Sequence, residues 1–472
     1  MVEILGKYVT EINDILWTYI LIAMLICVGV YFTFRSKFVQ FRSLGEMFRL
    51  LGEGTSRSKG ISSFQAFCIS TAARVGTGNI TGVAIAIALG GPGAVFWMWL
   101  IALIGSASAF VEATLAQIYK IKDGSTFRGG PAYYMEKALG QRWMGVLFAI
   151  LITLCFGLVF NSVQANTITV AFKSTYGLDR MTLGVILTVA LGMVIFGGVK
   201  RVAKVTEIIV PIMATAYILL AFYVLVTNIP ALPTLIKNIF SGAFGLQQVV
   251  GGGIGAAMMQ GIKRGLFSNE AGMGSAPNAS ATASVSHPVK QGLIQSLGVF
   301  VDTLIICSST AFIVLISGAY SVEGLEGIEI AQQALNMEVG VWAEHFLTIA
   351  ILLFAFTSLV GNYYYGETNI EFIKTSKAWL FIYRIAVLAM VIWGSVTQVQ
   401  MVWNMADLFM GLMAIINLIA IALLGKIAFA ALKDYNHQRS EGKDPVFYAN
   451  SIPGLKNIEC WDEQKETEVK AG

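Results

Sequence analysis

Long stretches of apolar residues dominate this sequence and decide the solvent in which it can fold. A helix needs about 20 apolar residues to cross the hydrocarbon core of a bilayer. The chain contains eleven runs of roughly that length, and 56% of its 472 residues are hydrophobic while only 13% are charged. A soluble protein carries about 25% charged residues and has no interior large enough to hide this apolar surface. We therefore expect an all-α integral membrane protein whose backbone hydrogen bonds close within each helix.

The apolar runs also divide the chain. The expected spans cover approximately residues 15 to 34, 62 to 89, 92 to 119, 144 to 172, 181 to 198, 205 to 228, 246 to 285, 291 to 318, 341 to 372, 378 to 397 and 404 to 425. We expect an N-terminal extra helix with a basic loop at 1-45, five-helix repeats at 46-228 and 229-425, and a polar tail without a packed core of its own at 426-472. The first run follows acidic residues, so we interpret it as a retained span rather than a signal peptide.

Lysine and arginine are distributed unevenly between alternate loops. They gather after spans 1, 3 and 5 and in the segment that follows span 11, whereas the opposite loops contain only Lys7, Lys173, Arg180 and Lys237. Basic residues near membrane spans are retained on the cytoplasmic side. We therefore expect a multi-pass protein of the cell membrane with its N-terminus outside and its C-terminus in the cytoplasm.

Several function classes are excluded by the residues that are missing. The five cysteines are scattered singly and the three histidines have no spacing typical of metal ligands, so we expect neither a disulfide framework nor a metalloenzyme. The net charge of +4 is not concentrated on a soluble domain, so we expect no nucleic-acid partner. No grouping of a nucleophile with a base is visible either, and we predict that the chain is not an enzyme and needs no cofactor.

Two of the expected spans contain glycine and polar groups at membrane depth. Span 2 includes 70-STAARVGTGNITG-82, and span 7 includes 251-GGGIG-255 followed by 265-GLFSNEAGMGSAPNAS-280. Each such glycine weakens a helix by ~1 kcal/mol relative to alanine. Unwound backbone is tolerated in a bilayer only where protein or a water-filled cavity supplies hydrogen-bond partners. Close packing through small residues explains the first glycine cluster of span 7, but it does not explain Arg74 or Glu270. We therefore predict two broken helices around a cavity.

The two interrupted spans are separated by an odd number of spans. Spans 2 to 6 and spans 7 to 11 consequently have opposite topologies, and span 1 lies outside both groups. This is the pattern of an inverted-repeat transporter, in which paired broken helices meet near the midplane at the binding site.

Four long motifs carry a resemblance to a known family. They are 73-ARVGTGNITG-82, 90-GGPGAVFWMWLIALIG-105, 265-GLFSNEAGMGSAPNASA-281 and 361-GNYYYGE-367. In this order they closely resemble the alanine/glycine:cation symporter family, also called the sodium:alanine symporter family, of bacteria and archaea. That family is similar in architecture to the LeuT-type transporters, with an inverted five-plus-five repeat. The resemblance implies sodium-coupled uptake of a small neutral amino acid such as alanine or glycine, with sodium as the coupling ion.

The resemblance also implies a sodium site. Beside the LeuT pattern, the site consists of the carbonyl groups of Ala72, Val75 and Phe354 with the hydroxyls of Thr357 and Ser358. Carbonyl and hydroxyl oxygens suit a hard monovalent cation without adding net charge. Taken alone, the two hydroxyls are more typical of side chains that bond back to carbonyls of their own helix.

For the substrate, the backbone N–H groups of Thr77 and Gly78 open the second half of span 2. A helix N-terminus offers free donors and a positive dipole end, which favour a carboxylate. Asn79 either adds a donor or caps the same half-helix. Across the cavity, Glu270 or the free carbonyls beside it are candidates to receive the substrate ammonium. The full set of candidate substrate residues is Gly76, Thr77, Gly78, Asn79, Phe160, Gln164, Asn166, Phe267, Ser268, Asn269, Glu270 and Met273.

Some alternatives remain open at this stage. A proton-coupled symporter or an exchanger would use a titrating carboxylate such as Glu270. Phe160, Phe267 and Met273 either limit the substrate to small side chains or only pack between helices. Arg74 is expected to form a structural or gate-forming ion pair, because buried charges are costly and usually pair, and direct contact with the substrate is the alternative. Its candidate partners are Glu112, Glu270, Asp302, Glu367 and Asp407.

Overall fold

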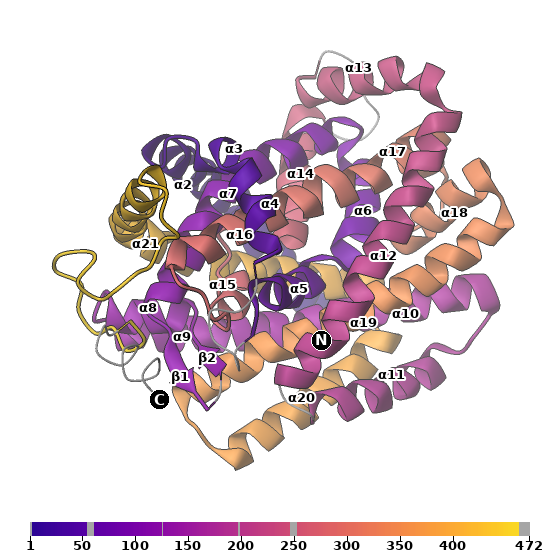
Figure 1. Ribbon diagram of the computed structural model, residues 1–472. Coiled ribbons are helices and arrows are strands. Elements are labelled where there is room, and N and C mark those ends of the chain that lie inside the picture. The colour runs from indigo at the N-terminus through magenta and orange to yellow at the C-terminus, as the bar shows by residue number, and fades with distance from the viewer. Residues whose placement is uncertain (1, 54–60, 125, 197–198, 246–252, 462–472) are drawn as a thin grey trace.

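The computed structural model describes residues 2–53, 61–124, 126–196, 199–245 and 253–461, and it is a bundle of helices with one short hairpin (Figure 1). Residues 246–252 of the expected span 7, which include the first two glycines of 251-GGGIG-255, and residues 462–472 of the expected tail lie outside the described residues. The remaining predicted segments can be compared with the structure.

The elements follow one another with few long connections. In chain order they are α1 (Val2–Ile15), η1 (Leu16–Leu21), α2 (Ile22–Arg35), α3 (Val39–Arg42), α4 (Leu44–Leu51), α5 (Ser63–Arg74), η2 (Gly78–Gly82), α6 (Val83–Gly90), α7 (Gly93–Ile118), β1 (Ile121–Asp123), β2 (Thr126–Arg128), α8 (Pro131–Lys137), α9 (Arg142–Ile152), η3 (Thr153–Phe160), α10 (Asn161–Tyr176), α11 (Arg180–Ile195), α12 (Val199–Thr227), η4 (Ile229–Ala231), α13 (Leu232–Ala243), α14 (Gly253–Asn269), α15 (Ala276–Ser280), α16 (Pro288–Phe300), η5 (Val301–Cys307), α17 (Ser308–Ser317), η6 (Ala319–Ser321), α18 (Ile328–Val339), α19 (Val341–Ile373), α20 (Lys377–Val396) and α21 (Val399–Ser440). The strands β1 and β2 pair antiparallel.

The long apolar helices confirm a multi-pass membrane protein. Within the described ranges, seven helices are long and apolar enough to cross a bilayer, and up to nine if each of two bent pairs counts as one span. The two other expected spans correspond to α11, which has only 16 residues, and to α14 with α15. The count of eleven and the inverted repeat therefore stay predictions.

The bundle also exposes large apolar side chains on its flanks. Helices α11 and α20 contact each other at the lower right of Figure 1, and α12 rises beside them. Ile186, Leu219, Phe222 and Ile382, which belong to these three helices, are each at least 58% exposed. A soluble protein does not expose apolar surface on this scale. These helices therefore face the lipid of a membrane.

Both predicted breaks are present. Helix α5 ends at Arg74 and the chain resumes helical geometry at Gly78, with a bend of 50° between the halves. Helix α14 ends at Asn269 and α15 begins at Ala276, because the chain between them adopts positive φ angles at Glu270, Gly272 and Gly274. Positive φ is incompatible with a right-handed helix. The second half of span 7 is much shorter than its partner in span 2, since α15 has five residues.

Two other features differ from the expected boundaries. Helix α12 meets η4 and α13 at a bend of 77°, which the apolar pattern of residues 205 to 228 did not predict. Helix α21 continues to Ser440, past residue 425 where we placed the start of the tail. The tail that follows packs against the main body through Phe447, Ile452 and Trp461, which are at most 9% exposed.

Candidate functional site

The break of span 2 presents two backbone donors in the interior. The N–H of Gly76 donates to Oδ1 of Asn79 at 3.0 Å, and the N–H of Thr77 donates to Oε1 of Gln164 at 3.2 Å. All four residues are buried. Donors at the start of a half-helix are the groups that bind a carboxylate. Here both donors are satisfied by side-chain amide oxygens.

Oxygen atoms gather on the other side of the same break. The hydroxyl of Ser358 on α19 lies within hydrogen-bond distance of three carbonyl oxygens, those of Ala72 at 2.8 Å, Val75 at 3.4 Å and Phe354 at 3.1 Å. The hydroxyl of Thr357 lies 2.8 Å from the same carbonyl of Phe354. The hydroxyls do bond back to their own helix, but Ser358 also reaches the carbonyls of α5. All five oxygens of the predicted sodium site are thereby brought together, and their chemistry fits a hard cation.

Two glycines are needed where the broken span meets its neighbours. A Cβ added to Gly76 would lie 2.2 Å from Oγ of Ser358 and 2.9 Å from Oε1 of Gln164. A Cβ at Gly78 would lie 2.9 Å from the ring of Phe267. At these distances a side chain at either glycine position would clash with its neighbours. The backbone of the break therefore approaches both α19 and α14 more closely than any residue but glycine allows.

One carboxylate connects the two broken spans. Asp302 on η5 accepts hydrogen bonds from Nδ2 of Asn79 at 2.6 Å and from the hydroxyl of Ser268 at 2.9 Å. The hydroxyl of Thr303 lies 3.0 Å from the same carboxylate. Asp302 is 1% exposed. Because it holds Asn79 of span 2 and Ser268 of span 7 at once, Asp302 fixes the distance between the two breaks.

The break of span 7 is held by a second carboxylate. Glu112 on α7 accepts the backbone N–H groups of Gly272 and Gly274, each at 3.1 Å, and the side-chain amide of Asn417 on α21 at 2.8 Å. The hydroxyl of Tyr134 in turn donates to Asn417. We call Glu112, Asn417 and the two glycine N–H groups the Glu112 clamp. It supplies the hydrogen-bond partners that unwound backbone requires in a bilayer.

Aromatic rings cover the two breaks from one side. Phe160 stacks on Phe267 with ring centroids 4.4 Å apart, and Phe267 packs against Trp403 at 4.7 Å. The guanidinium of Arg264 lies 4.5 Å above the ring of Trp403. The two broken helices thus bring backbone donors, carbonyl and hydroxyl oxygens and aromatic rings together in one buried region.

Comparison with known proteins decides the family. Residues 2–449 match the sodium:alanine symporter family. The chain belongs to this family. It is 62% identical to a probable sodium/glutamine symporter of Bacillus subtilis, over 98% of this chain and 97% of that protein. It is 36% identical to a sodium/alanine symporter of Methanococcus maripaludis, over 92% of this chain and 98% of that protein. The chain is therefore a sodium-coupled amino-acid symporter, and not an enzyme.

A solved structure supports the fold. The symporter superposes on a manganese transporter from Eremococcus coleocola with a TM-score of 0.52 at 13% identity, covering 84% of this chain and 93% of that one. At this identity the likeness shows the fold alone, which is LeuT-like. The resemblance inferred from the four motifs is thus confirmed for the family and for a LeuT-like fold.

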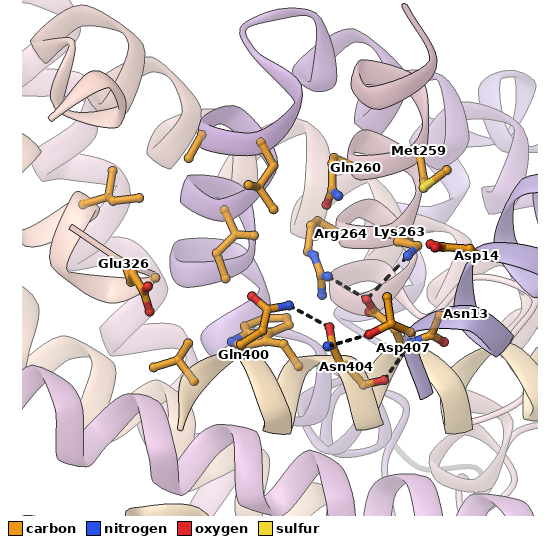
Figure 2. Close-up of a pocket in the computed structure, with 18 of the residues that line it drawn as sticks. Asn13, Asp14, Met259, Gln260, Lys263, Arg264, Glu326, Gln400, Asn404 and Asp407 are labelled. Atoms are coloured by element: carbon orange, nitrogen blue, oxygen red, sulfur yellow. Dashed lines mark hydrogen bonds and ion pairs between the residues drawn. The ribbon is translucent and has the colours of Figure 1, made fainter. Parts of the chain in front are cut away.

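A cavity of about 330 Å³ is lined in part by Trp403 of the aromatic cover, and Figure 2 shows other residues that line it. Its lining residues come from α1, α6, the middle of α14, the start of α18 with the loop before it, and the start of α21. Figure 2 shows Arg264 and Lys263 directed toward Asp407, at 2.8 and 3.7 Å. We call this side of the two breaks the cavity side. The other side contains α5, the start of α16 and the C-terminal half of α19, and we call it the closed side because its polar side chains are buried.

Some predicted residues lie elsewhere or have other partners. The side-chain amide of Asn166 donates to the carbonyl oxygens of Gly394 and Thr397, so it points toward the end of α20 and away from the breaks. Asn269 bonds to the hydroxyl of Thr303 and accepts the N–H of Ala271, which caps the end of α14. Met273 is fully buried within the break.

The lone arginine of span 2 interacts with three acids, which come from spans 3, 7 and 8. Glu270 accepts the hydroxyl of Ser275 at 2.6 Å. Arg74 interacts electrostatically with Glu112, Glu270 and Asp302. Across the described residues it makes no ion pair within 4 Å, so the expected direct pair is not seen; its one hydrogen bond goes to the carbonyl of Gln295 at 3.4 Å. Glu112, Glu270 and Asp302 are all buried, and Arg74 is a buried cation that interacts with all three.

Three residues at this centre were absent from the predicted binding set. From the sequence, Asp302 and Glu112 are predicted only as candidate ion-pair partners of Arg74, and no role is predicted for Trp403. Asp302 begins the second half of span 8, and a charged residue amid apolar neighbours was the one available signal. Trp403 carries no such signal, because aromatic residues are common at the ends of spans.

Proposed function

We propose that this symporter takes up a small neutral amino acid such as alanine or glycine together with sodium, by alternating access. One observation carries the proposal: the N–H groups of Gly76 and Thr77 and the carbonyl oxygens of Ala72 and Val75 belong to one short break. The donors suit the substrate carboxylate and the oxygens suit sodium. A ligand that orders the break therefore favours the binding of the other ligand, and the coupling is reciprocal.

The substrate displaces two internal hydrogen bonds when it binds. Its carboxylate takes over the N–H groups of Gly76 and Thr77 and releases the amides of Asn79 and Gln164, which then bond to the substrate. The ammonium group faces span 7, where Ser268 and the Glu270 region offer oxygen atoms. A membrane potential of 100 mV acting on one sodium ion supplies about 2.3 kcal/mol, or roughly fiftyfold accumulation, before any sodium concentration ratio is added.

The topology that fits this mechanism has eleven spans, with span 1 outside a five-plus-five inverted repeat. The uneven distribution of lysine and arginine supports an external N-terminus and a cytoplasmic C-terminus in the cell membrane. In this orientation the cavity side faces the outside. The cavity of about 330 Å³ is then the entry vestibule, and the aromatic cover of Phe160, Phe267 and Trp403 separates it from the site.

Two further candidates rest on specific observations. The relative that is 62% identical is described as a probable glutamine symporter, which favours glutamine as a second substrate to be assayed. A relative that is 39% identical, from Bacillus strain PS3, is described as a sodium/proton-dependent alanine carrier. Glu270 is buried and accepts a hydroxyl, so a proton-coupled symporter or an exchanger would use this carboxylate.

Reconstitution into liposomes tests the proposal. With an inward sodium gradient, we expect accumulation of labelled alanine or glycine, and the Thr357→Ala, Ser358→Ala double variant is expected to abolish it. Thr357→Ser is the matched control, because it keeps the hydroxyl, and we expect it to retain uptake. Undiminished sodium-dependent uptake by the double variant would refute the sodium site. Equal uptake in sodium-free buffer with a dependence on pH would favour the proton-coupled alternative.

A further inference from the structure

The closed side contains a group of polar side chains whose buried atoms lack partners. In the part of the chain that the structure describes, no hydrogen-bond partner exists for Nε and Nη2 of Arg74, for either polar atom of Gln291, Gln295 and Asn362, or for the hydroxyls of Thr71 and Tyr365. All six side chains are at most 5% exposed. They come from three helices, α5, α16 and α19, and all of them lie on the same side of the two breaks.

Helix α5, which carries Thr71 and Arg74, packs against both α16 and α19. Thr71 and Arg74 are three residues apart on α5, Gln291 and Gln295 are four apart on α16, and Asn362 and Tyr365 are three apart on α19. Residues three or four apart lie on one face of a helix. Arg74 bonds to the backbone of Gln295 and interacts electrostatically with Tyr365. On α19, a Cβ at the residue before Asn362 would lie 3.1 Å from α5.

This arrangement is costly in the state that the structure describes. Each buried polar group without a partner costs about 1–3 kcal/mol, and a charged group costs more. Such groups are rare in native proteins, and each of them needs an explanation. Apolar side chains would pack the same helices at no such cost. A second state in which water or a ligand enters this region would supply their partners.

We propose that these six side chains line the route by which the amino acid leaves the site for the cytoplasm, and that Arg74 binds the substrate carboxylate on this route. The inference rests on the alternating access proposed above. Arg74 lies two residues before Gly76, so a carboxylate released by the N–H groups of the break meets Arg74 as the next donor. In the state described here the route is closed and the cavity on the other side is open.

Cysteine accessibility tests the route directly. Gln291→Cys and Gln295→Cys are placed singly in a symporter whose five native cysteines have been replaced, and are probed with a membrane-impermeant thiol reagent in vesicles of both orientations. Ser296→Cys is the matched control on α16, because its side chain points to Ser106 of α7 at 2.6 Å. Gln260→Cys reports on the opposite cavity. Sodium-dependent uptake by each variant is measured in parallel.

We expect the two glutamine positions to react from the cytoplasmic side only. Sodium, which stabilises the state that is open to the outside, should slow this reaction about tenfold and speed the reaction at Gln260→Cys, as for a shift between two states. Ser296→Cys should not react. The proposed route would be overturned if neither glutamine variant reacted with the reagent. It would also be overturned if variants that still transport reacted at rates that do not depend on sodium. Loss of sodium-driven uptake in the wild type would instead overturn the proposed function.

The role of Arg74 has its own readout. We expect Arg74→Gln to lower the maximal uptake rate about tenfold with little change in KM, because the site itself keeps its ligands while release is slowed. Arg74→Lys keeps a cation on the route and should recover part of the rate. A wild-type rate in Arg74→Gln, or an equal loss in Arg74→Lys, would contradict the assignment.

Discussion

The cavity side and the closed side of the symporter treat their buried charges differently. On the cavity side, Arg264 and Lys263 both reach Asp407, and the three residues line a cavity of about 330 Å³. On the closed side, Arg74 makes no ion pair among the described residues, and both polar atoms of the side chain of Gln295, whose backbone Arg74 contacts, are without a partner. Both regions contain guanidinium atoms without a protein partner in the described part of the chain, Nε and Nη1 of Arg264 and Nε and Nη2 of Arg74. Arg264, however, has an ion pair and lines a cavity that water can enter, so its charge is compensated in this state, whereas that of Arg74 has neither among the residues that the structure describes.

The largest expected effect concerns the ion pair of the cavity side. Asp407→Asn leaves the guanidinium of Arg264 without its 2.8 Å partner, and losing one member of a buried pair costs about 3 kcal/mol. We expect a clear drop in the thermal unfolding temperature of the purified protein. Lys263→Gln, which removes a partner at 3.7 Å, should cost less. If both variants are as stable as the wild type, the cavity side is not held by this pair.

The next effect lies at the junction between the two sides. Gly76→Ala puts a methyl group 2.2 Å from the hydroxyl of Ser358, so we expect sodium-driven uptake to fall about 100-fold, a loss of about 2.7 kcal/mol. Gly82→Ala is the matched control in the same broken span, because its nearest neighbour would be 3.5 Å away. Uptake assays normalised to the amount of protein compare the two. Equal activity would show that the break does not approach α19 closely.

A smaller effect is expected from the Glu112 clamp. Glu112→Gln replaces a carboxylate that accepts two backbone N–H groups, and a lost acceptor for buried donors costs about 1–3 kcal/mol. We expect the KM for the amino acid to rise about tenfold, since the break of span 7 loses its support. Ser108→Ala, one turn earlier on α7 and beside Gly272, is the control. An unchanged KM in Glu112→Gln would show that the Glu112 clamp does not support binding of the amino acid.

The smallest effect is expected on α4, outside the predicted spans, where the charged groups are partly exposed. The hydrogen bond from Arg49 lowers the pKa of Glu46 to about 2. A depressed pKa means that the stability from Glu46 is present above pH 4.5 and is lost as the pH falls from there toward 2. Exposed pairs of this kind contribute at most about 1 kcal/mol. The unfolding temperature of Glu46→Gln should equal that of the wild type at low pH and lie slightly below it at neutral pH. A larger difference at low pH than at neutral pH would contradict the expected pH dependence.

The sequence predicted the breaks because glycine and polar residues at membrane depth have few physical explanations. The set of sodium oxygens was implied by the resemblance of the sequence to the LeuT pattern, and the oxygens of Ala72, Val75 and Ser358 do lie close together. It did not predict where side chains point. Asn166 bonds to the end of α20, and Asp302 joins the two breaks, because rotamers depend on neighbours from distant segments. The 77° bend after α12 carries no glycine or charge signal, and the tail packs through scattered apolar residues.

The central claim is that sodium and the amino acid share the break of span 2. The most direct test is the Kd of the purified symporter for its amino acid, measured by calorimetry over a series of sodium concentrations. We predict that Kd in the wild type falls about tenfold for each tenfold rise in sodium below saturation, and that Ser358→Ala loses this dependence. A Kd that is the same with and without sodium in the wild type would contradict the account.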